Sequence, residues 1–355
     1  MNDKIIMILD AGGTNFVFTA IQNGEEIVDP INLLANGDDL EKCIANMVSG
    51  FQQVKEKVPV APAAISFAFP GPADYPQGLI GYLKNLPGFY DGVPLASILE
   101  GEFNIPVYIN NDGDLYAYGE AMHGFLPELN HELQTRGINK EYRNLAAVTL
   151  GTGLGGGMVR NGELFIGDNS MGMEIWTTGN RYDIEGYAEN NVSTRAIKRF
   201  YKNRTGVDGL MPKDIYDIAM GQKEGDVQAA ENAFEEFGNS LGDVLANMIT
   251  IFDCNVVMGG GLVGASPLFM PAVLAQINGY FDKQKQYRRI TQEVFDYDTQ
   301  KEAFLENKSG VKVKIPHGEG LIYNPSPKVA IATSKLGASK AIALGAYAYA
   351  IKKLH

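Results

Sequence analysis

The feature that most constrains this chain is an internal repeat, whose two copies start about 140 residues apart. The first copy is KIIMILDAGGTNFVFTAIQNGEEIV, from Lys4 to Val28, and the second is LAAVTLGTGLGGGMVRNGELFIG, from Leu145 to Gly167. Each copy has an apolar run, a glycine loop, a second run and an Asn-Gly pair, which is the pattern of two strands followed by a tight hairpin turn. A repeat of this length predicts two related domains rather than a short-period solenoid.

The glycines of the second copy, Gly151, Gly153 and Gly156, also match the spacing of a dinucleotide-binding loop. Such a loop needs a helix that begins inside the glycine stretch, so that its N-terminus faces the pyrophosphate. Here the glycines lead into a hairpin, and no acidic residue ends a following strand of a βαβ unit. The sequence also lacks a Walker A pattern. The repeat therefore favours a different phosphate loop over a nicotinamide site.

Composition limits the remaining classes of protein. The 355 residues are 45% hydrophobic, which is enough for two cores. The net charge is −12 and Lys and Arg form no block, so we expect neither nucleic acid nor a membrane surface as a partner. Two cysteines, Cys43 and Cys254, cannot form a four-thiolate zinc site, and with no signal peptide we expect a cytoplasmic protein. Residues 255–281 carry no charge, but their glycines and prolines favour strand, loop and helix over a membrane span.

The rest of the chain alternates between strand and helix patterns. Apolar runs predict strands, and apolar residues at three- and four-residue steps predict helices. The expected strands are Lys4–Leu9, Ala64–Phe69, Val107–Asn110, Leu145–Leu150 and Val256–Met258, and the expected helices are Gly37–Val58, Pro212–Gln222, Gly225–Phe252 and Ala341–Lys353. The segment 286–325 is more polar and irregular, which is typical of an insertion.

Asp10, at the end of the first apolar run, precedes Gly12, Gly13 and Thr14. Glycines let backbone N–H groups approach anionic oxygens, the Thr14 hydroxyl adds a donor, and the Asp10 carboxylate can hold a hydrated Mg²⁺. Alone, the same residues fit a hairpin with a solvated aspartate. Thr152 and Gly153 supply equivalent groups in the second copy, so the two loops together predict a clamp for one polyphosphate.

Asn111 and Asp112 directly follow the predicted strand Val107–Asn110. A carboxylate at a strand end can accept a hydroxyl proton during attack on a γ-phosphate. The alternative is an ordinary Asx turn. Glu174 and Glu185 flank a polar stretch and could simply be solvated, and the histidines show no metal-binding spacing.

The order of several motifs resembles the ROK family of bacterial sugar kinases, which belongs to the actin-like ATPase superfamily. The motifs are DAGGTN, FPGPAD…NLPGF, NNDGDLYAYGEA, LGTGLGGG, DIEGYAE, VVMGGG and LGASKAIALGAY, and they cover nearly the whole chain. The resemblance implies an ATP- and Mg²⁺-dependent hexose 6-kinase. It also implies two actin-like (ribonuclease H-like) α/β domains with mixed sheets that flank an interdomain cleft. We expect a smaller domain of residues 1–120 plus 335–355 and a larger one of residues 121–334, with insertions at 125–143 and 286–325.

The resemblance also implies a role for each motif residue. Asp112 would be the general base on the sugar 6-hydroxyl. The substrate-binding residues would be Asn85, Asn111, Asp112, Glu174 and Glu185. The phosphates and metal would be held by Asp10, Gly12, Gly13, Thr14, Thr152 and Gly153, and the adenosine side would be lined by Gly259, Gly260 and Gly261.

The chain departs from the family pattern after Glu174. Most members have E-x-G-H and then a C-x-C-x₄-C zinc site, whereas here Thr177 stands near the histidine position and the loop is shortened to TTGNRYD. We therefore predict no structural zinc. Asn15 stands where many members carry Lys. Because the missing histidine changes the surroundings of the sugar, the substrate stays open among glucose-like, mannose-like and N-acetylated hexoses and fructose.

Two other functions occur for this kind of domain. Some members of the family are repressors with an N-terminal winged helix. Here the first motif starts at Asp10 and the net charge is −12, so we expect no DNA-binding head. The other function is that of a catalytically inactive sugar sensor, which the altered region after Glu174 suggests. Homodimers are common in the family, but no residue here establishes one.

Overall fold

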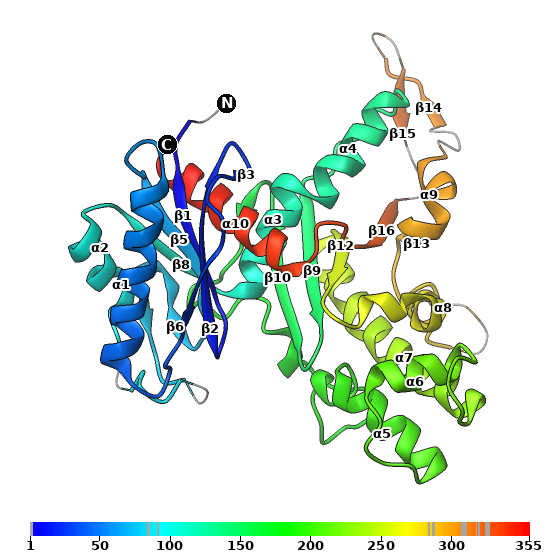
Figure 1. The fold of residues 1–355 in the computed structure, drawn as a ribbon. Coiled ribbons are helices and arrows are strands. Elements are labelled where there is room, and N and C mark those ends of the chain that lie inside the picture. Colours follow the sequence, from blue (N-terminus) through cyan, green and yellow to red (C-terminus); the bar gives the residue numbers. More distant parts are fainter. Residues whose placement is uncertain are drawn as a thin grey trace. The chain divides into compact units, whose positions relative to one another are not determined.

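The chain forms two compact units in the computed structural model, which describes residues 3–83, 86–90, 92–282, 285, 288–306, 311–316, 318, 320–323 and 327–355 (Figure 1). The first unit consists of Met1–Pro127, Gly157–Met173 and Lys335–His355, and the second of Glu128–Gly156 and Glu174–Ser334. The division falls inside two elements, α4 (Phe125–Thr135) and β10 (Leu154–Arg160).

The first unit is built on a mixed sheet. The strands of this unit are β1 (Ile6–Ala11), β2 (Asn15–Gln22), β3 (Glu25–Glu26), β4 (Ile31–Leu34), β5 (Ala64–Ala68), β6 (Ala73–Asp74), β7 (Leu79–Ile80), β8 (Val107–Asn110) and β11 (Glu163–Leu164), of which β6 and β7 form a separate pair and β11 belongs to the second sheet. Its helices are α1 (Leu40–Lys57), the 3₁₀ helix η1 (Tyr75–Gln77), α2 (Leu95–Phe103), α3 (Asp112–His123) and α10 (Ala338–Lys353). The order in the main sheet is β3-β2-β1-β5-β8, with β4 on β2. Strand β1 is antiparallel to β2 and parallel to β5, so the mixed α/β character that the sequence predicts is confirmed.

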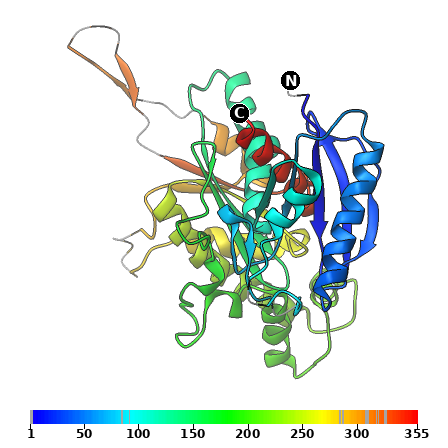
Figure 2. The same ribbon diagram turned by 90° about the vertical axis from the view of Figure 1, so that its left-hand side faces the viewer.

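Helices cover both faces of this sheet. Successive side chains of a strand point to opposite faces, and in β1 each face carries buried apolar side chains. Met7 and Leu9 of β1 pack into the core that includes residues of α1 and α2. Ile6 and Ile8 pack into the core that includes residues of α10. Figure 2 shows α1 and α10 on opposite sides of the blue strands. The last helix of the chain thus completes the unit that the first strand begins.

The second unit contains most of a second sheet, whose order is β11-β10-β9-β12-β16-β13. Its strands are β9 (Asn144–Leu150), β12 (Asn255–Gly259), β13 (Glu293–Asp296), β14 (Val311–Val313), β15 (Leu321–Tyr323) and β16 (Lys328–Thr333). Its helices are η2 (Ile175–Thr177), η3 (Ala188–Asn190), α5 (Thr194–Thr205), α6 (Pro212–Ala219), α7 (Val227–Phe252), η4 (Val263–Ala265), α8 (Ser266–Ile277) and α9 (Tyr297–Leu305). Strands β9, β12, β16 and β13 run parallel, and β14 and β15 form a separate two-stranded antiparallel sheet.

Both Asn-Gly pairs form the predicted hairpin turns. Asn23 and Gly24 have φ of 53° and 81°, and Asn161 and Gly162 have φ of 51° and 76°. Positive φ at both central residues defines the type I′ turn, whose twist matches that of the flanking strands. The turns join Gln22 to Glu25 and Arg160 to Glu163 in antiparallel register. The repeat therefore has the same local structure in both copies.

Two boundaries differ from the sequence expectation. The first unit includes residues 121–127 and 157–173 in addition to 1–120 and 335–355. Close packing explains the second addition, since a Cβ atom on Gly157 would lie 2.2 Å from the Gly113 carbonyl oxygen of α3. That the segment 286–325 is an insertion stays a prediction. Its expected irregularity is wrong for α9 and for β13, which is the edge strand of the second sheet. Val294 and Phe295 are buried there, but four residues are too short a run to show periodicity.

The uncharged stretch 255–281 folds as β12, η4 and α8. Among the described residues, no helix has the length and apolar character needed to cross a membrane.

Candidate active site

The first glycine loop, Gly12–Thr14, connects β1 to β2. The Gly12 N–H donates to the Asn15 carbonyl (3.1 Å), and the Thr14 carbonyl accepts from Ala35 N–H (2.9 Å). In the described part of the chain, the N–H groups of Gly13 and Thr14 donate to no other residue. All three loop residues are exposed. The loop thus presents two backbone donors to a ligand, as an anion-binding loop does.

The second glycine loop, Gly151–Gly153, connects β9 to β10 in the same way. The Gly151 N–H donates to the Gly153 carbonyl (3.1 Å) and closes the loop, while the Gly151 carbonyl accepts from Thr194 N–H (2.9 Å). The N–H groups of Thr152 and Gly153 donate to no described residue. Each copy of the repeat therefore contributes a three-residue loop with two amide donors that have no partner among the described residues.

Asp10 and Asp112 are the carboxylates of the first unit at the predicted site. Asp10 is exposed near the end of β1, and Asp112 is the exposed first residue of α3. Desolvation, followed by the negative charge of Asp112, raises the pKa of Asp10 above its ordinary value. A cation near the carboxylates of Asp10 and Asp112 would relieve this repulsion. Oxygen ligands from one or two carboxylates, with waters and substrate phosphates, are the usual set for Mg²⁺.

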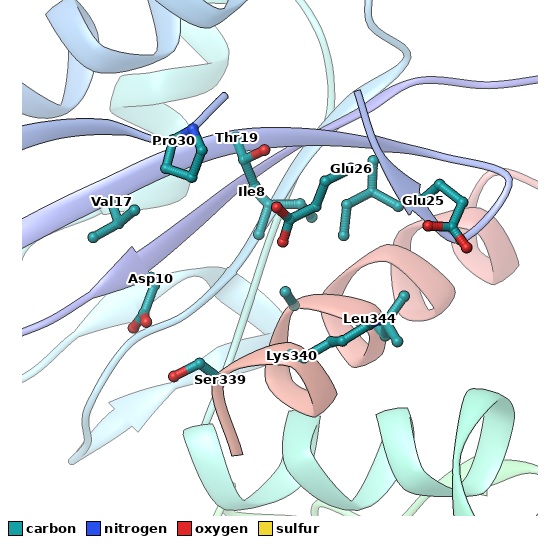
Figure 3. A pocket seen from close by; sticks show the side chains of 13 residues that line it. Ile8, Asp10, Val17, Thr19, Glu25, Glu26, Pro30, Ser339, Lys340 and Leu344 are labelled. Carbon is teal, nitrogen blue, oxygen red and sulfur yellow. The ribbon is translucent and has the colours of Figure 1, made fainter. Parts of the chain in front are cut away.

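Asp10 also lines a pocket of about 470 Å³ between the β1–β2 hairpin and α10. Figure 3 draws Asp10 and Ser339 toward one end of this pocket and Glu25 toward the other. The lining has three carboxylates, those of Asp10, Glu25 and Glu26, and one ammonium group, that of Lys340. This charge disfavours a phosphate inside the pocket, and none of the glycine-loop residues lines it. Of the predicted site residues that the structure describes, Asp10 alone lines this pocket.

Asn111 is the N-cap of α3, and its position is fixed from two sides. Its side-chain oxygen accepts from Gly113 N–H (2.7 Å), and its Nδ2 group donates to Tyr75 Oη (3.5 Å). Tyr75 Oη in turn donates to the Phe69 carbonyl (2.9 Å). The cap leaves one N–H of Asn111 for a ligand. Tyr75 is a supporting residue that the sequence did not indicate, since only its place directly after the FPGPAD motif marks it.

The carboxylates predicted to bind sugar in the second unit lie in an exposed, irregular segment. Glu174 is half-buried before η2, where its carboxylate accepts from the Trp176 indole N–H and its carbonyl accepts from Thr177 Oγ1 (2.8 Å). The Trp176 ring packs edge-to-face against the Tyr187 ring, with 5.6 Å between the ring centroids. Glu185 is exposed in a turn. Asn85 lies outside the described residues.

Gly259 is the last residue of β12, and Gly260 and Gly261 follow it beside the second glycine loop. Because β12 and β9 are parallel neighbours, Gly259 lies opposite Thr149, and the two glycine segments leave the sheet at the same edge. Gly260 has φ of 93°, and a Cβ atom there would lie 2.4 Å from the Leu150 carbonyl oxygen. That oxygen accepts from Leu262 N–H (3.1 Å). The predicted phosphate and adenosine segments of the second unit therefore lie together.

The predicted site residues thus form two sets. The first unit brings together Asp10, Gly12, Gly13, Thr14, Asn111 and Asp112, and the second unit carries Thr152, Gly153, Glu174, Glu185, Gly259, Gly260 and Gly261. The sequence did not indicate Glu189, whose carboxylate accepts from Leu154 N–H at the end of the second loop (3.1 Å). In the described ranges, no three His, Cys, Asp or Glu side chains gather around one point.

Comparison with known proteins places the chain among sugar kinases and their relatives. The family model described as ROK family matches residues 6–299. The crystal structure of glucokinase from Parabacteroides distasonis ATCC 8503 is 47% identical, covers 99% of this chain and 98% of that one, and has a TM-score of 0.92. An N-acetyl-D-glucosamine kinase of Vibrio cholerae is 28% identical over 71% of this chain and 83% of that protein. A xylose repressor of Caldicellulosiruptor bescii is 25% identical over 70% of this chain and 63% of that protein. The resemblance and the actin-like ATPase fold that it implies are confirmed, and the chain belongs to the ROK family.

Proposed function

We propose that this protein is an ATP-dependent sugar kinase that phosphorylates a hexose at its 6-hydroxyl, as a glucokinase does. The observation that carries the proposal is the pair of equivalent glycine loops, together with the Asp10 and Asp112 carboxylates. Each loop has two amide donors without a partner in the described part of the chain. The relative that is 47% identical over 99% of the chain is named a glucokinase, which supports the same activity.

Asp112 is the proposed general base. It occupies the first turn of α3, and its side chain is exposed. The carboxylate would accept the proton of the 6-hydroxyl as the oxygen attacks the γ-phosphorus. Positioned proton transfer of this kind contributes about 10²–10⁴ in rate. Asn111, held by Gly113 and Tyr75, would bind a neighbouring hydroxyl.

The phosphates of ATP would accept from the amides of Gly13, Thr14, Thr152 and Gly153. Backbone donors fixed in short loops need no reorganisation when charge moves from the γ-phosphoryl group to the leaving oxygen. Gly259, Gly260 and Gly261 would lie along the adenosine side, where glycine allows close approach of the nucleotide.

The donor set fits Mg²⁺. Asp10 would hold the ion with its carboxylate, whose pKa is raised by desolvation and then by the nearby charge of Asp112. When bound, the ion supplies neutralising charge to the β- and γ-phosphate oxygens. The absence of a larger carboxylate cluster among the described residues suits an ion that keeps several waters.

Glucose is the leading substrate, and mannose, an N-acetylhexosamine and fructose are the alternatives. Glu174 and Glu185, with Asn85, would accept or donate to the other sugar hydroxyls. The relative named N-acetyl-D-glucosamine kinase supports keeping amino-hexoses in the set. Thr177 stands near the position where most of the family has histidine, so we expect the sugar contacts here to differ from the common pattern.

A second candidate is a sugar-sensing protein without catalysis. The observation that favours it is the similarity to a xylose repressor over 70% of the chain. A panel of hexoses in a coupled ADP-release assay, with isothermal titration of each sugar, separates the two functions. Sugar-stimulated ADP release supports the kinase. Sugar binding without phosphorylation in the presence of Mg-ATP supports the sensor and rules the kinase out.

A further inference from the structure

Glu189 lies beneath the end of the second glycine loop. It belongs to η3, and its side chain is only 18% exposed. One carboxylate oxygen accepts from Leu154 N–H at 3.1 Å, and the other accepts from Arg195 at 2.7 Å. Leu154 is the first residue after the loop, so this bond fixes the point at which the loop enters β10.

The same carboxylate packs against Gly153. A Cβ atom at Gly153 would lie 2.4 Å from Oε2 of Glu189, closer than non-bonded atoms can approach. Gly153 does not have a positive φ, so its backbone conformation does not require glycine. Glycine is needed here because a side chain would clash with the Glu189 carboxylate. Glycine therefore lets the carboxylate reach the Leu154 N–H.

The loop is tied at its other end by the same part of the chain. Thr194, the first residue of α5, donates its N–H to the Gly151 carbonyl (2.9 Å). The Gly153 carbonyl and the Gly151 N–H bond to each other. With both ends held, the amides of Thr152 and Gly153 are the loop donors left without a partner in the described structure.

We propose that Glu189 is a positioning residue that holds the second glycine loop in shape for the phosphates of the nucleotide, with Arg195 cancelling its charge. This inference rests on the proposed kinase function. A carboxylate close to a polyphosphate site would repel the ligand, and the Arg195 guanidinium reduces that repulsion while orienting the oxygen that binds Leu154. The segment Glu185–Glu189 then joins a proposed sugar contact to the phosphate loop.

The test compares Glu189→Ala and Glu189→Gln with wild type, using the full chain. Glu189→Ala should raise the KM for ATP and the dissociation constant of Mg-ADP by about tenfold, the effect of one lost charge-assisted hydrogen bond. The KM for sugar should change less than twofold. Glu189→Gln keeps an acceptor for Leu154 N–H. On a logarithmic scale, it should raise the KM for ATP and the dissociation constant of Mg-ADP by less than half as much as Glu189→Ala does. Glu302→Ala, which breaks the exposed Arg136–Glu302 pair of the same unit, is the matched control and should leave both constants unchanged.

Two further variants keep the proposal testable if Glu189→Ala does not fold. Arg195→Met removes a side chain that is 63% exposed and leaves the carboxylate charge uncompensated, so it should raise the KM for ATP several-fold with the melting temperature preserved. Gly153→Ala should also weaken ATP binding. The effect should be smaller in the Glu189→Ala background, because the carboxylate no longer occupies the space that the added Cβ atom needs.

The outcomes distinguish this inference from the kinase proposal. If wild type phosphorylates no sugar, the kinase proposal fails first. If wild type is active and Glu189→Ala keeps the KM for ATP and the ADP affinity within twofold, the positioning role is wrong. Equal rises in the KM for both substrates, with a lower melting temperature, would show a merely structural role and overturn it too.

Discussion

The backbone of Gly260 lies so close to Leu150 that a Cβ atom on Gly260 would be 2.4 Å from the Leu150 carbonyl oxygen. The contact joins the carboxyl ends of β12 and β9, the two strands that carry the proposed adenosine and phosphate segments. Gly260 also has φ of 93°, a conformation that favours glycine.

Gly260→Ala should therefore destabilise the protein by more than about 2 kcal/mol, since the Cβ meets backbone and the positive φ adds strain. Gly261→Ala is the matched control, because a Cβ there meets no atom within 4 Å, and its effect should stay within about 0.5 kcal/mol. Urea unfolding of both variants measures the difference. Equal stability of the two would contradict the close approach of the strands.

Asp10→Asn should stabilise the metal-free protein at neutral pH. Desolvation and the Asp112 charge raise the pKa of Asp10, so the folded state holds this proton more tightly than the unfolded state does. Between the ordinary aspartate pKa and the raised one, stability falls as pH rises, and above both the charged carboxylate costs stability. The variant removes this cost, so its melting temperature should exceed that of wild type at neutral pH. The two should converge below the ordinary pKa of about 3.9.

The same variant should lose activity while gaining stability. Without the Asp10 carboxylate, Mg-ATP turnover should fall about 10–100-fold, as expected for a charged contact worth about 1.5–3 kcal/mol. Addition of Mg-ADP should raise the melting temperature of wild type more than that of the variant. Full activity in Asp10→Asn would remove Asp10 from the metal site.

Trp176→Phe tests the sugar role of Glu174. The variant keeps a ring beside Tyr187 but removes the indole N–H that donates to the Glu174 carboxylate. The KM for sugar should rise about three- to tenfold, the cost of one lost hydrogen bond, while the KM for ATP stays constant. Ile184→Ala is the control, because Ile184 is 96% exposed in the same segment. An unchanged KM for sugar would separate Glu174 from the substrate.

Chelation tests the prediction that the protein has no structural zinc. The family zinc cysteines are missing from TTGNRYD, and both cysteines of the chain, Cys43 and Cys254, are buried elsewhere as free thiols. We expect that EDTA leaves the melting temperature unchanged and that metal analysis finds zinc well below one equivalent. A stoichiometric zinc ion, or unfolding on chelation, would contradict this prediction.

The sequence predicted best the features that depend only on residues close together in the chain. Positive φ at Asn23, Gly24, Asn161 and Gly162 follows from residue type, so both hairpin turns could be placed from two letters each. The long helix α7 (Val227–Phe252) repeats its apolar residues over several turns and lies within two residues of its predicted start.

The features that the sequence missed depend on contacts between distant residues. Glu189 reaches Leu154 across 35 positions, and Tyr75 supports Asn111 across 36, so no spacing rule links either pair. Strand β13 is only four residues long and takes its place from pairing with β16. Residues 157–173 join the first unit through contacts such as that of Gly157 with Gly113, which no composition shift marks.

The most direct measurement is a coupled ADP-release assay on wild type and Asp112→Asn across glucose, mannose, N-acetylglucosamine and fructose. We predict that at least one hexose stimulates ADP release by wild type. Asp112→Asn should lower kcat by about 10²-fold or more, the effect of a lost general base, while isothermal titration shows sugar affinity within about threefold of wild type. The proposed function is contradicted if no hexose stimulates ADP release, and the role of Asp112 is contradicted if the variant turns over as fast as wild type.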